Sequence, residues 1–426
     1  MTLSSTTAHL PRGAVVEVPP ELLLPAGSTA NGAIGLHDYV ILGGGCAGLS
    51  AAIALLDAGA SGSILIVDSR VDYRDDRTWC FWDVEPTPFT HLARGRWNSW
   101  EVRSAGSRAV SSPSAGRTAY VSIAANDFYL YALDRLVTAG TVRLLFGEPA
   151  EAYVDTEDEV IVTTARHSLR ARQVIDARGL GMSGVDRARS KTSGTSLPQA
   201  FVGLHIVADH PVFDEDSCLL MDFTVDQSCG LRFMYVVPVS ATEALVENVF
   251  LTETGLSEAA YVAGIELYLA RSFGLEAHQY RVLSRERGCI PMTDSAFDNR
   301  PSPRVTLLGT LGGATRPSTG YTFLRIQRSC RAAAARLVNG SERGGESDPC
   351  SLLDSIFLRF LRDHPERAPR VFHRMFDAVD PNALVRFLSD QSDWRDIARL
   401  IIALPKIWFL AAALKVLVGR LGNVAR

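Results

Sequence analysis

Apolar and polar positions alternate with two different periods along the 426-residue chain. Near its start, residues 39–42 and 64–67 form short apolar runs, and between them alanine, leucine and isoleucine recur at helical spacing up to Gly59. Short apolar runs are typical of buried strands, and a repeat of three to four positions is typical of a helix. The pattern predicts a strand, a helix and a second strand over residues 39–68.

The middle of the chain has the shorter period. Strands are predicted over 142–146, 159–163 and 173–175, and four alternating runs follow at residues 201–207, 218–225, 230–239 and 243–251. Alternation over four to eight residues indicates half-buried strands, so these four runs predict a second, largely antiparallel sheet. A helix over 257–271 and a strand over 281–290 lead back towards the apolar run at 305–308.

The C-terminal part returns to helical spacing. From Leu352 onward apolar residues recur every three or four positions between prolines, which predicts a set of short amphipathic helices. The last helix, residues 406–420, combines an apolar run with basic residues: Ile407, Trp408, Phe409 and Leu410 with Lys406, Lys415 and Arg420. Such a helix suits a membrane interface. The alternative, that it caps the core, fits the same pattern.

The first 36 residues lack periodicity and are rich in small and turn-forming residues, so a disordered tail is predicted there. They do not have the charged start and apolar centre of a signal peptide. No uninterrupted apolar segment reaches the roughly 20 residues that span a bilayer. We therefore expect a cytoplasmic protein, soluble or peripheral to the cytoplasmic membrane.

Composition narrows the function classes. A hydrophobic fraction of 47% is enough for a large core, and a net charge of −4 gives no electrostatic footprint for nucleic acid. The seven cysteines include no CxxC pair and are read as reduced thiols. The nine histidines show no metal-ligand spacing, so no metal site is expected.

Candidate chemistry begins with the glycines of the first unit, Gly43-x-Gly45-x-x-Gly48, and with Asp68 at the end of its second strand. The first glycine makes a tight turn, the second lets the backbone approach a pyrophosphate, and the third lets the helix pack on the strand. The helix N-terminus favours the phosphate charge, and the acid accepts hydrogen bonds from ribose hydroxyls. This order of parts predicts a dinucleotide site.

A second glycine-rich stretch, "VTLLGTLGGATRPSTGYTF" at 305–323, follows a strand and precedes a helix. In two-part flavin folds the corresponding strand ends in Gly-Asp, whereas here Gly309 is followed by Thr310. We expect FAD, with its adenosine half at residues 43–68 and its ring system near 312–321. Further cofactor contacts are expected from the following residues: Gly312, Gly313, Gly320, Arg77, and Asp176 in "VIDARG".

Several motifs together carry a family resemblance. "DRTWCFW" (76–82), "VIDARG" (174–179), the run 221–250, "RGCIPMTD" (287–294) and "GTLGGATRPSTGYTFLRIQ" (309–327) resemble the bacterial lycopene β-cyclases, in matching order from about residue 37 to the C-terminal helices. The resemblance implies proton-initiated closure of the linear ψ ends of lycopene into β-ionone rings, giving β-carotene via γ-carotene. It implies reduced FAD, NADPH as electron source, and no net redox change.

A proton-initiated cyclisation needs a buried acid. Glu247 shares a predicted strand face with Leu245 and Val249, and it matches the glutamate regarded as the acid/base in the family. Apolar surroundings keep a carboxyl group protonated. Glu286 is the second catalytic candidate, although a surface ion cluster with its neighbouring arginines is the alternative. The polyene is expected to lie against aromatic side chains, with plain core packing as the alternative: Trp79, Phe81, Trp82 and Tyr321.

The predicted fold class is α/β: a Rossmann-type FAD-binding domain interleaved with a largely antiparallel substrate sheet, followed by a helical region. The predicted segments are a tail (1–36), three FAD-domain segments (37–110, 111–200 and 291–345), the substrate sheet (201–290) and a C-terminal helical, membrane-contacting region (346–426). Two other classes stay open at this point. One is a flavin-dependent hydroxylase or reductase acting on an apolar isoprenoid, and the other is a flavoprotein that binds carotenoid without changing it.

Overall fold

The computed structural model describes residues 9–24, 33–112, 118–180, 194–252, 256–341 and 351–424. Its first sheet has the strand order β8-β2-β1-β11-β10-β9, and β17 pairs with β11. The strands are β1 (Ala33–Leu42), β2 (Ile64–Asp68), β8 (Val142–Phe146), β9 (Ala150–Asp155), β10 (Val160–Thr164), β11 (Ser168–Asp176) and β17 (Val305–Leu307). The strands β8, β2, β1, β11 and β17 are parallel, as expected for a dinucleotide-binding sheet.

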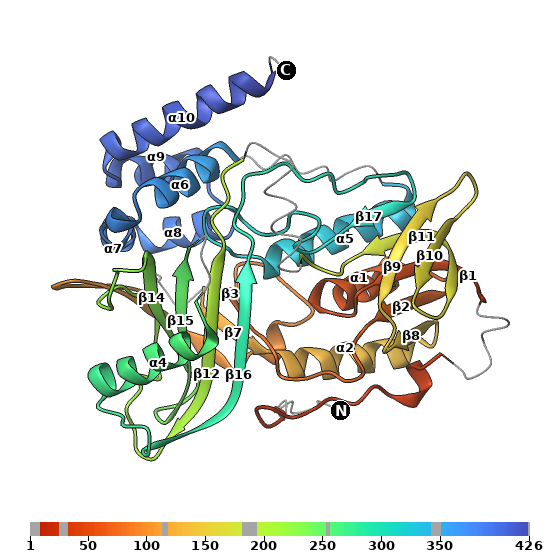
Figure 1. Ribbon diagram of the computed structural model, residues 1–426, viewed down its shortest axis with the longest axis horizontal. Helices are drawn as coiled ribbons and strands as arrows, with labels where there is room; N and C mark the ends of the chain where they lie inside the picture. Colours follow the sequence, from red (N-terminus) through yellow and green to blue (C-terminus); the bar gives the residue numbers. More distant parts are fainter. Residues whose placement is uncertain are drawn as a thin grey trace.

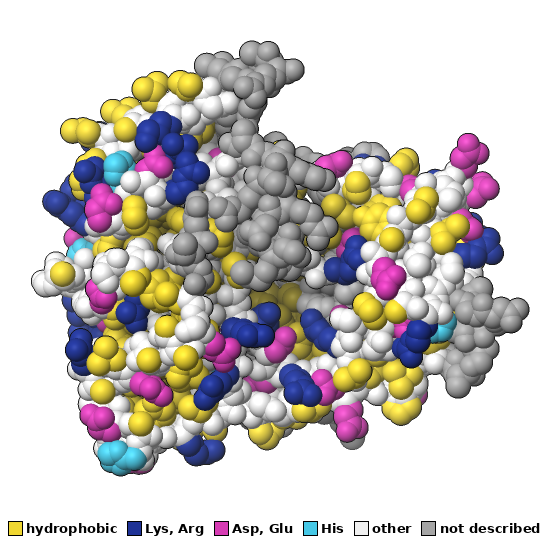
Figure 2. Space-filling model, in the orientation of Figure 1, with side chains coloured by type: hydrophobic (Ala, Val, Ile, Leu, Met, Phe, Trp, Pro, Cys, Tyr) yellow, Lys and Arg dark blue, Asp and Glu magenta, His cyan; other side chains and the backbone are white. Residues whose placement is uncertain are grey.

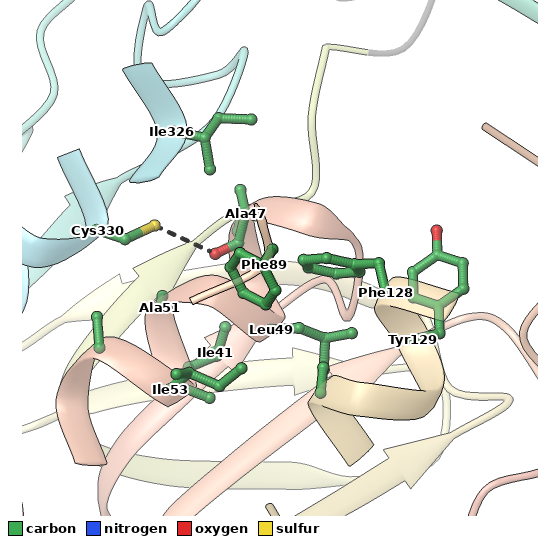
Figure 3. Packing of buried hydrophobic residues seen from close by; sticks show 14 of the residues in the cluster. Ile41, Ala47, Leu49, Ala51, Ile53, Phe89, Phe128, Tyr129, Ile326 and Cys330 are labelled. Carbon is green, nitrogen blue, oxygen red and sulfur yellow. Dashed lines mark hydrogen bonds between the residues drawn. The ribbon is translucent and has the colours of Figure 1, made fainter. Parts of the chain in front are cut away.

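Three helices cover this sheet: α1 (Cys46–Asp57), α2 (Ala125–Ala139) and α5 (Phe323–Asn339) (Figure 1). Figure 3 shows how they pack: Ile41 and Leu49 lie between sheet and helices, and Ile326 and Cys330 of α5 lie over Ala47. The Cys330 thiol donates to the Ala47 carbonyl at 3.5 Å. Because α5 packs directly on α1, the glycine-rich stretch that precedes α5 is held beside the glycine loop that precedes α1.

The second sheet has the order β16-β12-β15-β14-β13-β5-β6. Its strands are β5 (Ser99–Ser104), β6 (Ser107–Ser111), β12 (Gln199–Ala208), β13 (Ser217–Asp222), β14 (Leu231–Pro238), β15 (Glu243–Leu251) and β16 (Tyr280–Ile290). The predicted antiparallel strands are confirmed. A small third sheet, β3-β7-β4, consists of β3 (Thr78–Trp82), β4 (Gly95–Trp97) and β7 (Tyr120–Ala124).

One predicted boundary was wrong. Residues 37–110 were assigned to the cofactor domain, yet β5 and β6 belong to the second sheet, where β13 pairs with β5 in parallel. The physical reason is burial: Trp100 and Val102 of β5 point into the core beneath the C-terminal helices. That core forms only when β5 extends the second sheet.

Helices cover both faces of the second sheet (Figure 1). Helix α4 (Glu258–Phe273) packs on β12 and β15, and α7 packs on β5 and β6. The C-terminal helices confirm the predicted set: α6 (Ser351–Asp363), α7 (Ala368–Ala378), α8 (Pro381–Leu388), α9 (Trp394–Ala403) and α10 (Lys406–Val424). The Arg420 side chain lies outside the described residues. Short 3-10 helices are η1 (Pro20–Leu22), η2 (Thr90–Leu92) and η4 (Pro365–Arg367).

The predicted disordered tail was wrong for residues 9–24 and 33–36. Val16 exchanges backbone hydrogen bonds with Tyr73, Leu22 is 1% exposed, and Leu24 donates to the Leu144 carbonyl. Residue 33 already begins β1. A few buried apolar anchors and backbone bonds hold this N-terminal segment, and such isolated anchors leave no periodic pattern in a sequence. The rest of the predicted tail, 1–8 and 25–32, lies outside the described residues.

Candidate active site

A cavity of about 560 Å³ runs from the glycine loop of the first sheet to the inner face of the second sheet. Its walls combine backbone of the glycine loops, the β3 strand, five strands of the second sheet (β12 to β16), and α7 and α8. Of the residues predicted for the site, those that line it are Gly43, Gly45, Asp68, Arg77, Trp79, Glu247, Gly309, Gly320 and Tyr321. The structure therefore joins the predicted cofactor and acid positions in one space.

The glycine loop has the geometry that a bound pyrophosphate needs. Gly43 has φ +96°, and a Cβ at Gly48 would lie 1.8 Å from the Gly43 carbonyl, so both positions require glycine. A Cβ at Gly45 would meet only the Arg70 guanidinium, at 3.3 Å. Gly45 caps α1, and within the described residues this end of the helix has no side-chain cap hydrogen bond. This loop thus fits a dinucleotide phosphate approaching the backbone.

Asp68 ends β2 at the cavity, as predicted. Its two carboxylate oxygens accept hydrogen bonds from the Gly44 N–H at 2.5 Å and from the Arg70 N–H at 2.8 Å. These bonds fix the carboxylate, whose remaining lone pairs can accept from ribose hydroxyls. Arg70 also lines the cavity. Sequence analysis missed this arginine, because no spacing rule marks a basic residue two positions after the acid.

The flavin-side stretch reaches the cavity through Gly309, Thr310 and residues 318–323. Thr310, which stands where an acid is usual, accepts a hydrogen bond from the Leu180 N–H at 3.1 Å. Gly312 and Gly313 do not line the cavity. A Cβ at Gly312 would lie 2.3 Å from the Leu307 carbonyl, so the chain needs this glycine to turn tightly after β17.

Two other predicted positions are occupied by protein partners. Asp176 is buried, and Arg178 holds its carboxylate at 2.7 Å, so that Arg178 rather than Asp176 lines the cavity. Arg77 lines the cavity and donates to the Arg287 carbonyl at 2.8 Å. Its guanidinium bridges from the cofactor domain to β16.

The acid end is built across four neighbouring strands. Glu286 of β16 pairs with Gly203 of β12, Gly203 pairs with Glu247 of β15, and Glu247 pairs with Tyr235 of β14. All four residues therefore face the same side of the sheet. A Cβ at Gly203 would lie 3.0 Å from Cγ of Glu247 and 3.1 Å from Cγ of Glu286. Because glycine has no side chain, the two carboxyl groups, called here the carboxyl pair, meet above it.

The carboxyl pair is buried and hydrogen-bonded within itself. Glu247 is 9% exposed and lines the cavity, whereas Glu286 is 4% exposed and lies behind it. Burial, the charge of Glu286 and the hydrogen bond to it raise the pKa of Glu247 well above its usual range, against the opposing effect of Arg77. The surface alternative for Glu286 was wrong, because the neighbouring side chains of β16 point outward while Glu286 points in.

Burial alone would raise the pKa of Glu286 as well, but its hydrogen bonds outweigh burial and lower it. The Thr78 hydroxyl donates to Oε2 of Glu286 at 2.9 Å, and Nε2 of His205 lies 3.4 Å from the same oxygen. The two directions favour the proton on Glu247 and the negative charge on Glu286. The result is a neutral acid at the end of an apolar cavity and an anion directly behind it.

Comparison with known proteins identifies the family. The model of the family described as lycopene cyclase protein matches residues 38–414. The chain belongs to the lycopene cyclase family.

Individual relatives agree with this assignment. The chain is 29% identical to a lycopene β-cyclase from Paracoccus sp. over 299 residues, covering 67% of this chain and 70% of that protein. It is 24% identical to a lycopene β-cyclase from Pantoea ananas, covering 88% and 97%. The N-terminal segment lies outside the matched family region.

Solved structures share the fold. A geranylgeranyl bacteriochlorophyll reductase-like protein from Thermoplasma acidophilum has a TM-score of 0.58 at 13% identity, covering 86% of this chain and 96% of that one. A p-nitrophenol 4-monooxygenase from Pseudomonas putida has a TM-score of 0.55 at 19% identity, covering 91% and 96%. These neighbours share the α/β fold that was predicted.

In this lycopene cyclase family member, only part of the predicted aromatic wall faces the cavity. Trp79 and Tyr321 line it, whereas Phe81 stacks on Phe323 at 4.7 Å and Trp82 packs on Tyr120 at 4.7 Å in the core behind. The wall also contains aromatic residues that sequence analysis did not single out: Tyr120, Tyr129, Phe201, Phe233, Tyr235, Phe323, Phe372 and Phe376. Alternation along β12 and β14 is the signal that would have identified Phe201 and Phe233.

Proposed function

We propose that this protein is a lycopene β-cyclase that converts the ψ ends of lycopene to β-ionone rings with FAD bound and no net redox change. The observation that carries the proposal is Glu247, a buried acid with a raised pKa that lines one end of the cavity among apolar side chains, while the other end is a dinucleotide loop. A linear hydrocarbon fits such walls. A proton is the reagent that this end of the cavity supplies.

The reaction balances with the groups present. Glu247 gives its proton to the terminal double bond of the polyene, and the electrons of the next double bond close the six-membered ring. The cation that results loses a proton from the ring carbon next to the cationic carbon, and the carboxylate left on Glu247, which lines the cavity, can accept that proton. Substrate and product are isomers, so no electron is consumed.

Cation stabilisation and the exclusion of water come from the walls. Tyr235 lies beside Glu247 on the next strand, and its hydroxyl meets that of Tyr120 at 3.0 Å. Ring faces attract a cation within about 6 Å. When bound, reduced FAD would add an electron-rich ring face, and we propose NADPH as its electron source. The loops at Gly45, Asp68, Gly309 and Gly320 would hold the cofactor.

The test is a product analysis in deuterated water. Purified protein, lycopene in liposomes and chemically reduced FAD are incubated under argon. The carotenoids are then separated by chromatography, and their masses are determined by mass spectrometry. A ring-closed isomer that carries solvent deuterium supports the proposal. A product with changed hydrogen or oxygen content, formed with stoichiometric NADPH consumption, indicates a flavin-dependent hydroxylase or reductase. Unchanged lycopene that copurifies with the protein indicates simple binding.

We also propose that α9 and α10 contact the membrane. An apolar ridge on these helices is 46–81% exposed and consists of Ile401, Ile402, Ile407, Leu410, Leu414, Leu417 and Val418. On α10 the spacing of three and four places these residues on one face, and Figure 2 shows hydrophobic side chains along this edge. The opposite face is packed, with Phe409 stacked on Phe360 of α6 at 4.7 Å.

No single helix among the described residues is long and apolar enough to cross a bilayer; α9 and residues 406–419 pass only together, across a bend of 117°. A ridge that lies in the interface would let lycopene move from the bilayer towards the cavity. Liposome flotation of Ile402→Ser/Ile407→Ser against wild type tests this. Val154→Ser, which changes an equally exposed residue of β9, is the control. Equal flotation of all three proteins would refute membrane contact through the ridge.

A further inference from the structure

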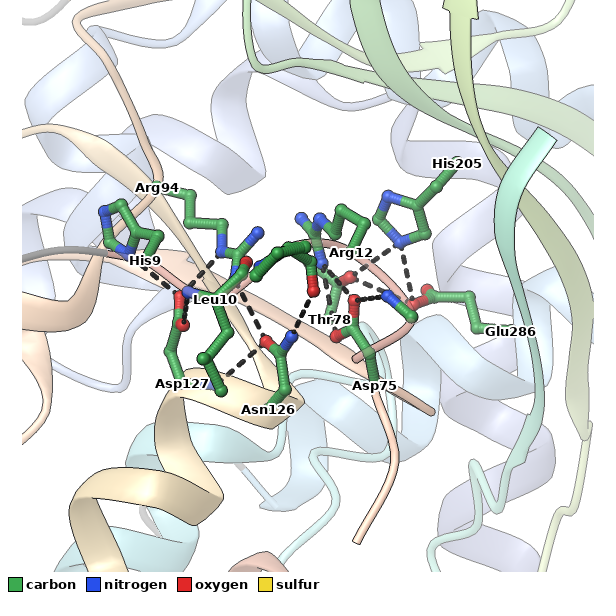
Figure 4. A network of polar contacts seen from close by, with 12 residues as sticks. His9, Leu10, Arg12, Asp75, Thr78, Arg94, Asn126, Asp127, His205 and Glu286 are labelled. Carbon is green, nitrogen blue, oxygen red and sulfur yellow. Dashed lines mark hydrogen bonds and ion pairs between the residues drawn. The ribbon is translucent and has the colours of Figure 1, made fainter. Parts of the chain in front are cut away.

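His205 is a buried histidine next to the carboxyl pair that the reaction does not touch. It lies on β12, two residues beyond Gly203 and on the same face, and it is 1% exposed. Its Nε2 is 3.3 Å from Oγ1 of Thr78 and 3.4 Å from Oε2 of Glu286 (Figure 4). Its Nδ1 has no hydrogen-bond partner within the described parts of the chain.

Strand register places His205 outside the cavity. Successive same-face positions of β12 are Gln199, Phe201, Gly203 and His205, and the first two line the cavity. At Gly203 the carboxyl pair closes the cavity. His205 stands one step deeper, beside Leu245 of β15, in the packed core. Any effect of His205 on a polyene therefore passes through the two groups that its Nε2 contacts, Glu286 and the Thr78 hydroxyl.

The contacts of Glu286 decide which carboxyl group keeps the proton. Its Oε2 accepts from the Thr78 hydroxyl and faces Nε2 of His205, which has its polar contacts within the described residues with these two groups. When one ring nitrogen of a histidine lies beside a hydrogen-bond acceptor and the other has no partner, the N–H is placed on the nitrogen beside the acceptor. A carboxylate that receives several donors stays ionised, and the proton of the carboxyl pair is then left on Glu247.

We propose that His205 is a positioning residue that holds Glu286 as the anion of the carboxyl pair and so leaves the transferable proton on Glu247. For its catalytic consequence this inference rests on the proposed cyclase function. The placement of the proton itself does not depend on any substrate. Glu247 alone faces the cavity, so a proton that moved to Glu286 would be lost to the reaction.

The other charged or titratable groups around the carboxyl pair do not supply this bias. Arg77 acts on Glu247 and lowers its pKa, which opposes protonation there. Burial raises the pKa of the Cys80 thiol and keeps it neutral. Arg12 of the N-terminal segment is paired with Asp75 at 3.4 Å, a buried and internally balanced ion pair (Figure 4). The side chains that flank Glu286 on β16 are exposed.

The experiment is an infrared titration of FAD-loaded protein in the Glu247→Gln background, where Glu286 is the one member of the carboxyl pair that can bind a proton. With His205 present, we expect Glu286 to stay ionised down to a pH below the ordinary glutamate pKa of about 4.3. In Glu247→Gln/His205→Leu we expect its protonated carboxyl band to appear at least about two pH units higher, because burial then dominates. Glu247→Gln/His205→Gln, which keeps a donor of similar reach, should shift less.

Two controls make the result decisive. Glu247→Gln/His37→Leu changes a half-buried histidine on β1 of the other sheet, and it should titrate like the parent. Bound FAD and the melting temperature report whether each variant is folded, and His205→Gln serves if His205→Leu does not fold. Identical titration with and without His205 overturns the proposal, whether or not the protein cyclises lycopene.

The single variants give the kinetic arm. His205→Leu should lower kcat about 10- to 100-fold, less than the roughly 10²- to 10⁴-fold that a general acid contributes, because Glu247 itself is kept, with KM for lycopene unchanged. His205→Gln should restore part of the loss. A rise in KM and a fall in kcat together with loss of FAD would assign His205 a merely structural role and contradict the inference.

Discussion

The two ends of the cavity are built in different ways. The cofactor end depends on backbone: Gly43 and Gly45 of the glycine loop, and Gly309 and Gly320 of the later stretch, line the cavity without a side chain at those positions, close to the Asp68 carboxylate. The proton end is made of side chains on a sheet, where the carboxyl pair meets above Gly203. One end thus depends on local chain geometry, and the other depends on how distant strands align.

This difference separates binding from chemistry. Backbone amides and helix termini hold a phosphate without any titrating group. The carboxyl pair instead needs one proton on a chosen oxygen, and strand register supplies that choice by placing Glu247 in the cavity and Glu286 behind it. Substitutions at the two ends should therefore fail in distinguishable ways.

The largest effect is expected from Glu247→Gln. An amide keeps the shape and the hydrogen bond to Glu286 but cannot deliver the proton, so cyclisation should fall by about 10³-fold or more, about 4 kcal/mol in transition-state stabilisation. The bound FAD should remain. Product formation and flavin content, measured on the same preparation, check both halves of this expectation.

Glu243→Gln is the matched control, since it makes the same change at the first residue of the same strand. It should leave kcat within about twofold of the wild-type value. If Glu247→Gln kept near-normal activity, the acid would lie elsewhere and the contrast between the two ends would collapse.

Gly45→Val should break the cofactor end. The Cβ of the new side chain meets only the flexible end of Arg70, so the protein should fold, but the methyl groups beyond it would fill the space that a pyrophosphate needs. We expect FAD affinity to drop about 100-fold, about 3 kcal/mol, by fluorescence titration. Gly35→Val, in a strand position with open space around the Cβ, is the control. Full flavin content in purified Gly45→Val would contradict the assignment of the glycine loop.

How far the sequence predicted the site follows the same division. The cofactor end was predictable because its parts are consecutive, with strand, glycines, helix and Asp68 in a fixed order. Glu247 was predictable from alternation on one strand. Gly203 and His205 were not, because their role appears only when β12 lies between β15 and β16 in one register.

The errors have physical causes as well. Asp176 was a poor choice because the arginine two residues later neutralises it locally. Phe81 and Trp82 were expected in the cavity, but β3 is paired with β7 so that these rings pack into the core. The N-terminal segment is held by single anchoring residues such as Val16, and isolated anchors produce no periodic pattern in the sequence.

Gly203→Ala tests the proton end of the cavity, which depends on strand register. The added methyl group would lie about as close to both carboxyl side chains as real contacts allow, and 2.9 Å from Cδ1 of Leu245, so the carboxyl pair must separate. We expect kcat to fall about 10-fold, about 1.4 kcal/mol, with FAD affinity unchanged. Gly35→Ala should change neither quantity. A loss of FAD in Gly203→Ala, rather than of kcat, would show that the two ends are not independent.

The smallest effect concerns stability against pH. The raised pKa of Glu247 stabilises the folded protein below the unfolded glutamate pKa of about 4.3, and this contribution is lost as pH rises towards and through the raised value. The lowered pKa of Glu286 acts in the opposite sense: its contribution is present above about 4.3 and is lost as pH falls through the folded value. The acid that performs the chemistry therefore costs stability at neutral pH, whereas its anionic partner does not.

Glu247→Gln should accordingly be more stable than wild type at neutral pH while it is inactive. We expect a gain of about 1 kcal/mol, about 2 °C in Tm, that shrinks as pH falls to about 4. Thermal melts of the FAD-loaded proteins between pH 4 and pH 8, recorded about every half pH unit, measure this difference in stability. A constant difference across this range would mean that Glu247 is ionised when the protein is folded. A neutral acid would then be missing from the cavity, and the cofactor end would be the only part of the site that the structure explains.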